Sequence, residues 1–315
     1  MSELVGLDKL SCFFDVGRGQ RVHAVDNVSL SIAEGETLGL VGESGSGKST
    51  LGKTLMGLND KTSGSVTYRG KHLPAHYRSA DFKRMATVMQ MIFQDPYSSL
   101  NPRMTVGEII AEGLRLRNGP KERVGEWLEK VGLSASHASR YPHEFSGGQR
   151  QRIGIARALI MEPEFVVCDE PISALDVSVQ AQVVNLLNDL KKSMGLTMLF
   201  IAHDLSMVRY ISDRMAVMYL GSIMELGKAA DVYFQPRHPY TEILIASNPE
   251  PDPNAERQRL STPIQGEIPS PVNVPAGCRF AGRCPKVMQV CREKTPPLIP
   301  LLNEDRQVAC HLYSA

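Results

Sequence analysis

Hydrophobic positions in this chain form short runs of strand length, separated by stretches with the spacing of helices. The runs expected to form strands are Leu4–Leu10, Val28–Ile32, Thr37–Val41, Val66–Tyr68, Met91–Phe93, Phe165–Cys168, Thr197–Ala202 and Arg214–Tyr219. Helical patterns occupy Lys48–Gly57, most of Thr105–Met161, and a segment that follows Asp176. Strands that alternate with helices predict an α/β fold with a mostly parallel sheet covered on both faces.

Two changes in this pattern predict how the chain is organised. The helix-rich stretch of about residues 97–160 interrupts the alternation, which predicts a helical subdomain inserted into the sheet. Composition changes near Asn248, because residues 249–275 are rich in proline and polar side chains. We therefore expect one domain over residues 1–248 and a small extension over residues 249–315.

Composition and charge exclude several classes of protein. Hydrophobic residues make up 42% and charged residues 22% of the 315 residues, as in ordinary globular proteins. The net charge is only +1, which disfavours nucleic acid as a ligand. No apolar run is long enough to cross a membrane, and the first residues lack the pattern of a secretion signal. With six cysteines, these features predict a soluble chain in a reducing cell interior.

A glycine-rich loop follows the predicted strand Thr37–Val41. Residues 42–49 read Gly-Glu-Ser-Gly-Ser-Gly-Lys-Ser, which fits G-x-x-x-x-G-K-[ST], and they open a predicted helix. Backbone N–H groups of such a loop face phosphate oxygens, the lysine reaches the β- and γ-phosphates, and the last serine ligates Mg²⁺. The loop predicts a nucleoside triphosphate site with these contacts: Gly42, Ser44, Gly45, Gly47, Lys48, Ser49 and Thr50.

Two later segments carry further chemistry. The apolar run Phe165–Cys168 ends in Asp169 and Glu170, and acids at the carboxyl end of a parallel strand face the ligand site. Asp169 suits Mg²⁺, and Glu170 suits polarisation of an attacking water. Residues 146–149, Ser-Gly-Gly-Gln, start a predicted helix and form a second anion site. Two such sites on one chain can serve a nucleotide shared between two subunits.

The order of these motifs resembles that of ATP-binding-cassette ATPases over roughly residues 4–247. The matching series is the loop at 42–49, Gln94, the turn at 146–149, the acids at 169–170, Ser173–Asp176 and His203. Phe145 departs from the leucine more common before this Ser-Gly-Gly-Gln, and we expect no loss of activity from it. The resemblance implies a P-loop NTPase fold with an N-terminal β-subdomain and a helical subdomain.

The resemblance also implies a role for each matching residue. Phe14 aligns with the aromatic residue that stacks on adenine, with Phe13 as a weaker candidate and two core aromatics as the alternative. Glu170 is the general base, His203 contacts the γ-phosphate, and Gln94 senses Mg²⁺ and water and signals to a membrane partner. The residues implied at the subunit interface are Ser146, Gly148, Gln149 and Asp176, the first three closing on ATP held by the opposing subunit.

Cysteines gather in the predicted extension, at Cys278, Cys284, Cys291 and Cys310. Four thiols in a short cytosolic segment favour a metal site over disulfides. Their spacing matches neither the usual zinc pairs nor the ferredoxin run, so it leaves open the metal, or four unligated thiols. Residues 237–241 and 266–271 and Gly277-Cys278 resemble the extension of oligopeptide and dipeptide importer ATPases, closest to the second ATPase subunit. That resemblance implies a 4Fe–4S cluster, with Zn²⁺ as the alternative and His311 as a substitute ligand.

The implied function is ATP hydrolysis that drives import of oligopeptides or dipeptides. The implied partners are a paralogous ATPase, two permease subunits and a periplasmic or lipid-anchored peptide-binding protein, with no nucleic acid. The implied location is the cytoplasmic side of the inner membrane. One alternative keeps this architecture but imports nickel or another small solute. The other is a soluble cassette ATPase in DNA repair or translation, which the short separation of Ser49 from Ser146 disfavours.

Overall fold

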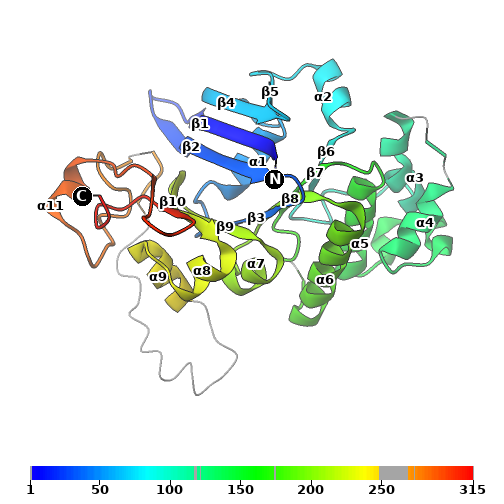
Figure 1. The fold of residues 1–315 in the computed structure, drawn as a ribbon. Coiled ribbons are helices and arrows are strands. Elements are labelled where there is room, and N and C mark those ends of the chain that lie inside the picture. Colours follow the sequence, from blue (N-terminus) through cyan, green and yellow to red (C-terminus); the bar gives the residue numbers. More distant parts are fainter. Residues whose placement is uncertain are drawn as a thin grey trace.

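The structure, a computed structural model, describes residues 2–116, 119–120, 122–173, 175–247, 269–272 and 274–314. Two sheets organise these residues (Figure 1). The four-stranded antiparallel sheet has the order β2 (Arg21–Ala33), β1 (Glu3–Asp15), β4 (Ser63–Tyr68) and β5 (Lys71–His72). The eight-stranded sheet has the order β11 (Ile299–Pro300), β12 (Arg306–Val308), β10 (Ser222–Lys228), β9 (Arg214–Tyr219), β3 (Thr37–Val41), β8 (Thr197–Ile201), β7 (Phe165–Asp169) and β6 (Met89–Ile92).

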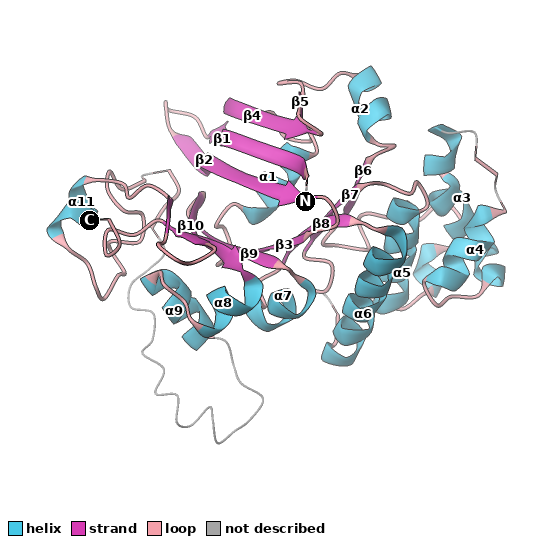
Figure 2. Ribbon diagram, viewed as in Figure 1, coloured by secondary structure: helices cyan, strands magenta, loops and turns pink. Residues whose placement is uncertain are grey.

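Helices connect and cover these strands (Figure 2). The described helices are α1 (Lys48–Leu55), α2 (Ser79–Met85), α3 (Val106–Ala111), α4 (Arg123–Lys130), α5 (Gly147–Leu159), α6 (Val177–Met194), α7 (Leu205–Ile211), α8 (Ala229–Phe234), α9 (Pro239–Ala246) and α11 (Gln289–Glu293). Short 3₁₀ turns at Gly113–Leu116, Ala135–Ser139 and Pro142–Glu144 break the stretch between α3 and α5. No helix among the described residues has both the length and the apolar character needed to cross a bilayer.

Parallel pairing holds the centre of the larger sheet together. Strands β6 to β9 and β3 pair in parallel, so their carboxyl ends meet at one edge. Alternate residues of β7 enter two different cores, Val166 and Cys168 on one face and Phe165 and Val167 on the other. The prediction of an α/β fold is confirmed. Different elements cover the two faces of the larger sheet. Helices α6 to α8 lie on one face, whereas α1 and the smaller sheet lie on the other (Figure 1).

Strand β10 was absent from the sequence-based prediction because a charge interrupts its apolar pattern. Glu225 is fully buried in the middle of this strand and pairs with Arg306 of β12 at 3.4 Å. Two backbone N–H groups, of Arg237 and His238, also donate to the Glu225 carboxylate. A buried carboxylate needs such partners, and these come from residues distant in the chain.

The C-terminal segment, residues 269–314, packs against the same core as the helices. Its strand β12 pairs antiparallel with β10, and Phe280 and Cys291 belong to the core that α6 to α9 cover. The segment lies beside α9 and β10 in Figure 1. The predicted boundary near Asn248 falls outside the described residues, and the helical division at 97–160 likewise stays a prediction.

Candidate nucleotide-binding site

The glycine-rich loop bridges β3 and α1 at the carboxyl edge of the larger sheet. Gly47 occupies the position before α1 with φ 102°, and Gly42 has φ 152°. A Cβ on Gly47 would overlap the carbonyl oxygen of Ala24, and one on Gly42 would overlap that of Met218. Both positions therefore require glycine, and the loop follows a path that a side chain would block.

Lys48 lies at the centre of this loop. Its Nζ donates to the carbonyl oxygens of Gly42 at 2.8 Å and Glu43 at 3.0 Å. Burial lowers the pKa of the Lys48 ammonium, while the nearby carboxylates of Glu170, Asp169 and Glu43 act to raise it. A buried cation held by loop carbonyls suits an anionic ligand at the mouth of the loop.

One hydrogen bond joins the end of the loop to β7, and a second joins the segments that follow β6 and β7. Ser49 Oγ donates to Asp169 Oδ1 at 2.7 Å, which places a hydroxyl and a buried carboxylate side by side. Gln94, after β6, donates from Nε2 to Glu170 Oε2 at 2.7 Å. Glu170 has φ 45°, and its backbone N–H donates to Ile201 O, which holds the residue in this uncommon conformation. Four predicted residues from three segments thus meet at one edge.

A cavity of about 460 Å³ opens above the loop. Its predicted lining residues are Phe14, Ser44, Gly45, Gly47, Lys48, Ser49, Thr50, Gln94 and Glu170. Phe14 is 41% exposed, whereas the ring of Phe13 packs against that of His23 with ring centroids 4.1 Å apart. The structure thus places Phe14, rather than Phe13, at the wall of the cavity. The sequence analysis missed three lining residues, which are Val22 and Ala24 on β2 and Pro271 of the C-terminal segment. None of the three belongs to a sequence motif that could have indicated its place.

The Ser-Gly-Gly-Gln turn begins α5 as the sequence predicts. Ser146 and Gln149 form a capping box, in which Gln149 Oε1 accepts from Ser146 N at 3.0 Å and Ser146 Oγ accepts from Gln149 N at 3.4 Å. A Cβ on Gly148 would overlap the side chain of Val179 on α6, so close helix packing requires glycine there. This turn does not line the cavity formed by the described residues of the same chain.

The cavity lining also lacks Gly42 and Asp169, which border it through Lys48 and Ser49, and two exposed residues, His203 and Asp176. His203 follows β8, its side chain is exposed, and it makes no hydrogen bond or ion pair with any described residue. Asp176 occupies the position before α6 but makes no capping hydrogen bond from its side chain. Both Asp176 and its neighbour Val177, which is 78% exposed, lie on the surface.

The predicted metal site in the extension is not supported by the structure. The thiols of Cys278, Cys284 and Cys310 each have a raised pKa, mainly because they are buried, and the other thiols add to the effect. For Cys278 the pKa rises to about 11, which favours a neutral thiol. No group of three or more His, Cys, Asp or Glu side chains among the described residues is arranged to hold a metal ion. Spacing alone could not decide this, because ligation depends on side-chain geometry.

Comparisons with known proteins add to this geometry. The ABC transporter family model matches residues 25–173, and that of the oligopeptide/dipeptide transporter C-terminal region matches residues 224–291. The chain is 58% identical to YkfD of Bacillus subtilis, provisionally called an oligopeptide transport ATP-binding protein, over 98% of this chain and 95% of that protein. It is 50% identical to the oligopeptide transport ATP-binding protein OppF of Salmonella typhimurium, over 94% of this chain and 92% of OppF.

Solved structures agree with the sequence comparisons. An ATP-binding cassette dimer in a post-hydrolysis state, bound to ADP and phosphate, is 28% identical to this chain with a TM-score of 0.66. The match covers 72% of this chain and 99% of that cassette. The likeness therefore includes nearly all of a single cassette and leaves part of this chain outside it.

Proposed function

We propose a function from one premise: this chain belongs to the family of ATP-binding proteins of oligopeptide ABC transporters. It is an ATP-hydrolysing subunit that energises an oligopeptide importer, which implies permease subunits and a binding protein as partners. The observation that carries this function is the meeting of Lys48, the Ser49–Asp169 pair and the Gln94–Glu170 pair at one edge.

The donor set at this edge fits ATP with Mg²⁺. Hard oxygen ligands suit Mg²⁺, and Ser49, Asp169 and the Gln94 amide oxygen would hold it. The ion supplies neutralisation of phosphate charge. The loop N–H groups and Lys48 bind the phosphates, and the exposed ring of Phe14 offers a face for adenine.

Glu170 is the residue that we propose as general base. Its carboxylate is held by Gln94 at 2.7 Å, which aims one oxygen and leaves the other for a water. Gln94 itself orients that water and registers whether nucleotide is present. We assign contact with the γ-phosphate to His203, whose exposed ring can turn toward a bound nucleotide.

A second subunit completes the site in this proposal. The Ser146 turn presents a helix start but does not line the cavity of its own chain, so it is available to ATP bound on a partner. Gly148 and Gln149 belong to the same turn, and exposed Asp176 lies at the same interface. We propose a paralogous ATPase as the partner. Mass spectrometry of the purified transporter should find one copy of this chain, and two copies would refute the pairing.

An apolar groove supports docking to a permease. The groove of about 450 Å³ is lined by side chains such as Leu58, Phe82, Met85 and Phe93. Leu58 is 49% and Phe82 is 39% exposed, and Phe93 precedes Gln94 in the chain. Contact at the groove can therefore reach the nucleotide through one peptide unit. We place the subunit on the cytoplasmic side of the inner membrane, and Phe82→Asp should detach it from membranes that contain the permeases.

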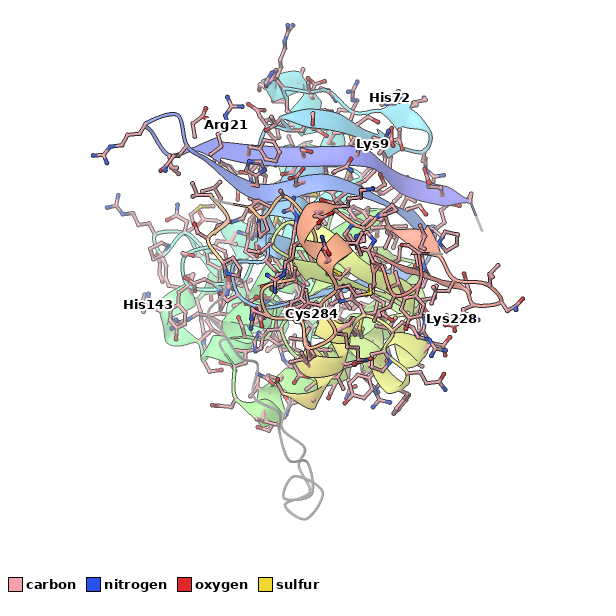
Figure 3. The ribbon with its side chains drawn as sticks, turned by 90° about the vertical axis from the view of Figure 1, so that its left-hand side faces the viewer. Lys9, Arg21, His72, His143, Lys228 and Cys284 are labelled. Atoms are coloured by element: carbon pink, nitrogen blue, oxygen red, sulfur yellow. The ribbon has the colours of Figure 1, made fainter. Side chains whose placement is uncertain are left out.

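The four cysteines of the C-terminal segment are the basis for the metal that we propose. We retain a 4Fe–4S cluster, with Zn²⁺ as the alternative, only because four cysteines share one small segment (Cys284 is labelled in Figure 3). Iron, acid-labile sulfide and zinc should be measured on the full chain after anaerobic purification. A sample without any of the three would leave four free thiols, as the structure has them.

The cargo that we propose is an oligopeptide or dipeptide. Peptides are favoured over nickel or another small solute because the match to the oligopeptide/dipeptide C-terminal region includes residues 224–291. Cells that lack this chain should lose uptake of a radiolabelled oligopeptide and keep uptake of ⁶³Ni²⁺. The opposite result would exchange the two cargoes.

One variant tests the ATPase assignment. Glu170→Gln keeps the shape of the side chain and its contact with Gln94 but removes the base, so ATP should bind normally while turnover falls at least about 100-fold. Glu129→Gln, an exposed acid on α4, is the matched control and should hydrolyse ATP like the wild type. Normal hydrolysis by Glu170→Gln in the assembled transporter would contradict the assignment of the base.

A further inference from the structure

Glu43 places a negative charge in the phosphate-binding loop, which is otherwise suited to an anion. It follows Gly42 directly, and its carbonyl oxygen accepts from Lys48 Nζ at 3.0 Å. Its backbone N–H donates to the hydroxyl of Tyr240 at 2.9 Å. The main chain of Glu43 is therefore part of the loop, while its carboxylate needs a partner that keeps it from repelling phosphate.

Arg283 of the C-terminal segment is that partner. Its guanidinium binds the Glu43 carboxylate through both ends, with Nη1–Oε2 at 2.8 Å and Nη2–Oε1 at 3.0 Å. The two side chains are only 6% and 15% exposed, so solvent screens the pair weakly. Arg283 also donates to the hydroxyl of Tyr219 at 3.2 Å, which fixes the guanidinium on the sheet. The fork geometry is specific to arginine.

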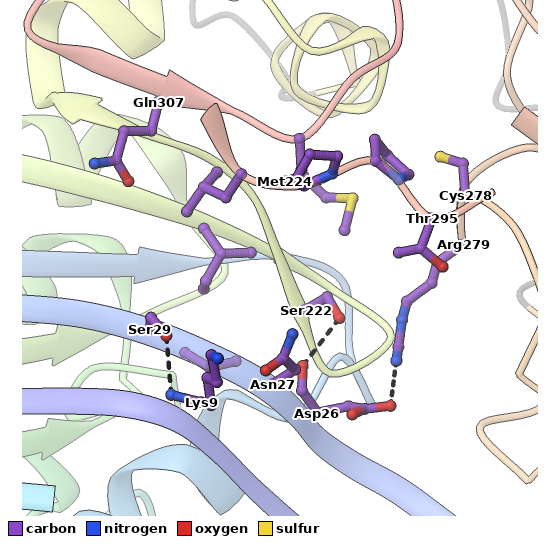
Figure 4. Close-up of a pocket in the computed structure, with 16 residues that line it drawn as sticks. Lys9, Asp26, Asn27, Ser29, Ser222, Met224, Cys278, Arg279, Thr295 and Gln307 are labelled. Atoms are coloured by element: carbon purple, nitrogen blue, oxygen red, sulfur yellow. Dashed lines mark hydrogen bonds and ion pairs between the residues drawn. The ribbon is translucent and has the colours of Figure 1, made fainter. Parts of the chain in front are cut away.

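The C-terminal segment also contributes directly to the nucleotide cavity. Pro271 lines the cavity, and its carbonyl oxygen accepts from His23 N on β2 at 3.0 Å. Nearby, Arg279 donates to Leu220 O and to Asp26 at the edge of a separate cavity of about 500 Å³ (Figure 4). The segment is thus attached both to β2 and to the phosphate loop.

We infer that Arg283 is a positioning residue of the nucleotide site, which neutralises Glu43 and so sets the affinity of the phosphate loop for ATP. This inference rests on the function proposed above and adds the C-terminal segment to the nucleotide site. Without Arg283, the Glu43 carboxylate would lie beside Lys48 and repel the incoming phosphates. ATP affinity should fall, while the hydrolytic residues Gln94 and Glu170 keep their arrangement.

The test, on the full chain, separates neutralisation of the Glu43 charge from a purely structural role of Arg283. Arg283→Met should weaken binding of a fluorescent ATP analogue roughly tenfold and raise KM by a similar factor, with little change in kcat. The double variant Glu43→Gln with Arg283→Met removes the unpaired charge and should recover affinity to within about threefold of wild type. Lys286→Met is the matched control, because Lys286 lies on the same segment as Arg283, is outside the cavity lining, and pairs with Glu242 of α9 at 2.8 Å. This variant should leave affinity unchanged.

The outcomes distinguish failure of the proposed function from failure of the inference about Arg283. A wild-type chain that fails to bind the analogue refutes the proposed function itself. A wild-type chain that binds, together with Arg283→Met at wild-type affinity, overturns the inference alone. A double variant as weak as Arg283→Met assigns the residue a purely structural role and also overturns it. If Arg283→Met does not fold, Arg283→Lys is the substitute, because it keeps the positive charge without the forked guanidinium. Its affinity for the ATP analogue should lie between that of the wild type and complete loss of binding. If Glu43→Gln/Arg283→Lys has the same affinity as Arg283→Lys, the inference is overturned.

Discussion

A methyl group at Gly47 tests how tightly the phosphate loop is built into the fold. In Gly47→Ala the new Cβ would overlap the carbonyl oxygen of Ala24 and lie 3.1 Å from its carbonyl carbon. Ala24 is part of β2, so the neighbour that must move is backbone in a sheet. A φ of 102° adds strain for any residue with a Cβ.

The cost can be estimated from a second glycine in the same loop. Gly45 has φ 76°, and a Cβ there would meet no atom within 4 Å, so Gly45→Ala carries backbone strain alone, about 1–2 kcal/mol. Gly47→Ala adds the collision, for which overpacking values suggest a further ~2–3 kcal/mol. At about 2–4 °C per kcal/mol, Gly47→Ala should lower Tm by roughly 6–20 °C and Gly45→Ala by roughly 2–8 °C.

Thermal unfolding without nucleotide is the suitable assay, because it separates the fold from contacts with phosphate. Gly47→Ala should also lose binding of the fluorescent ATP analogue, since the start of α1 moves with the loop. Equal Tm values for the two variants would refute the reasoning, because they would show that the contact with Ala24 costs nothing.

Three further variants test the site and the buried polar network. Phe14→Ala should weaken binding of the fluorescent ATP analogue about tenfold, because stacking on adenine is lost. Phe13→Ala removes the ring packed on His23, so it should lower Tm and leave the affinity for the analogue close to that of the wild type. Burial lowers the pKa of His238 to about 4. Between pH 6.5 and pH 4 the unfolded chain therefore binds a proton that the folded chain excludes. As the pH falls through this range, up to roughly 3 kcal/mol of the free energy of unfolding is lost. His238→Asn keeps an acceptor for Tyr240 N and should unfold with a shallower pH dependence in this range; an unchanged slope would contradict the assignment.

Local chemistry explains how much of the site could be predicted from sequence. The loop at 42–49, the acids after Phe165–Cys168 and the turn at Ser146 each act through a few consecutive residues, so spacing alone indicates their use. Strands β3 and β9 were likewise predicted with the bounds that the structure has, because their apolar runs are uninterrupted. The spacing of the cysteines along the chain could not predict a metal site in the same way, because ligation needs four thiols to converge in space.

Contacts between distant segments were decided only by the tertiary structure. The pairing of Arg283 with Glu43 joins residues 240 positions apart, and Pro271 reaches a cavity built mainly from the first part of the chain. Strand β10 can hold the buried Glu225 because its partners come from distant segments: the backbone N–H groups of Arg237 and His238, and Arg306 of β12. The amino-acid sequence by itself determined the chemistry that this protein carries, because phosphate-binding motifs are local. Packing determined which charges are compensated, because a buried charge is stabilised only by partners that the fold brings to it.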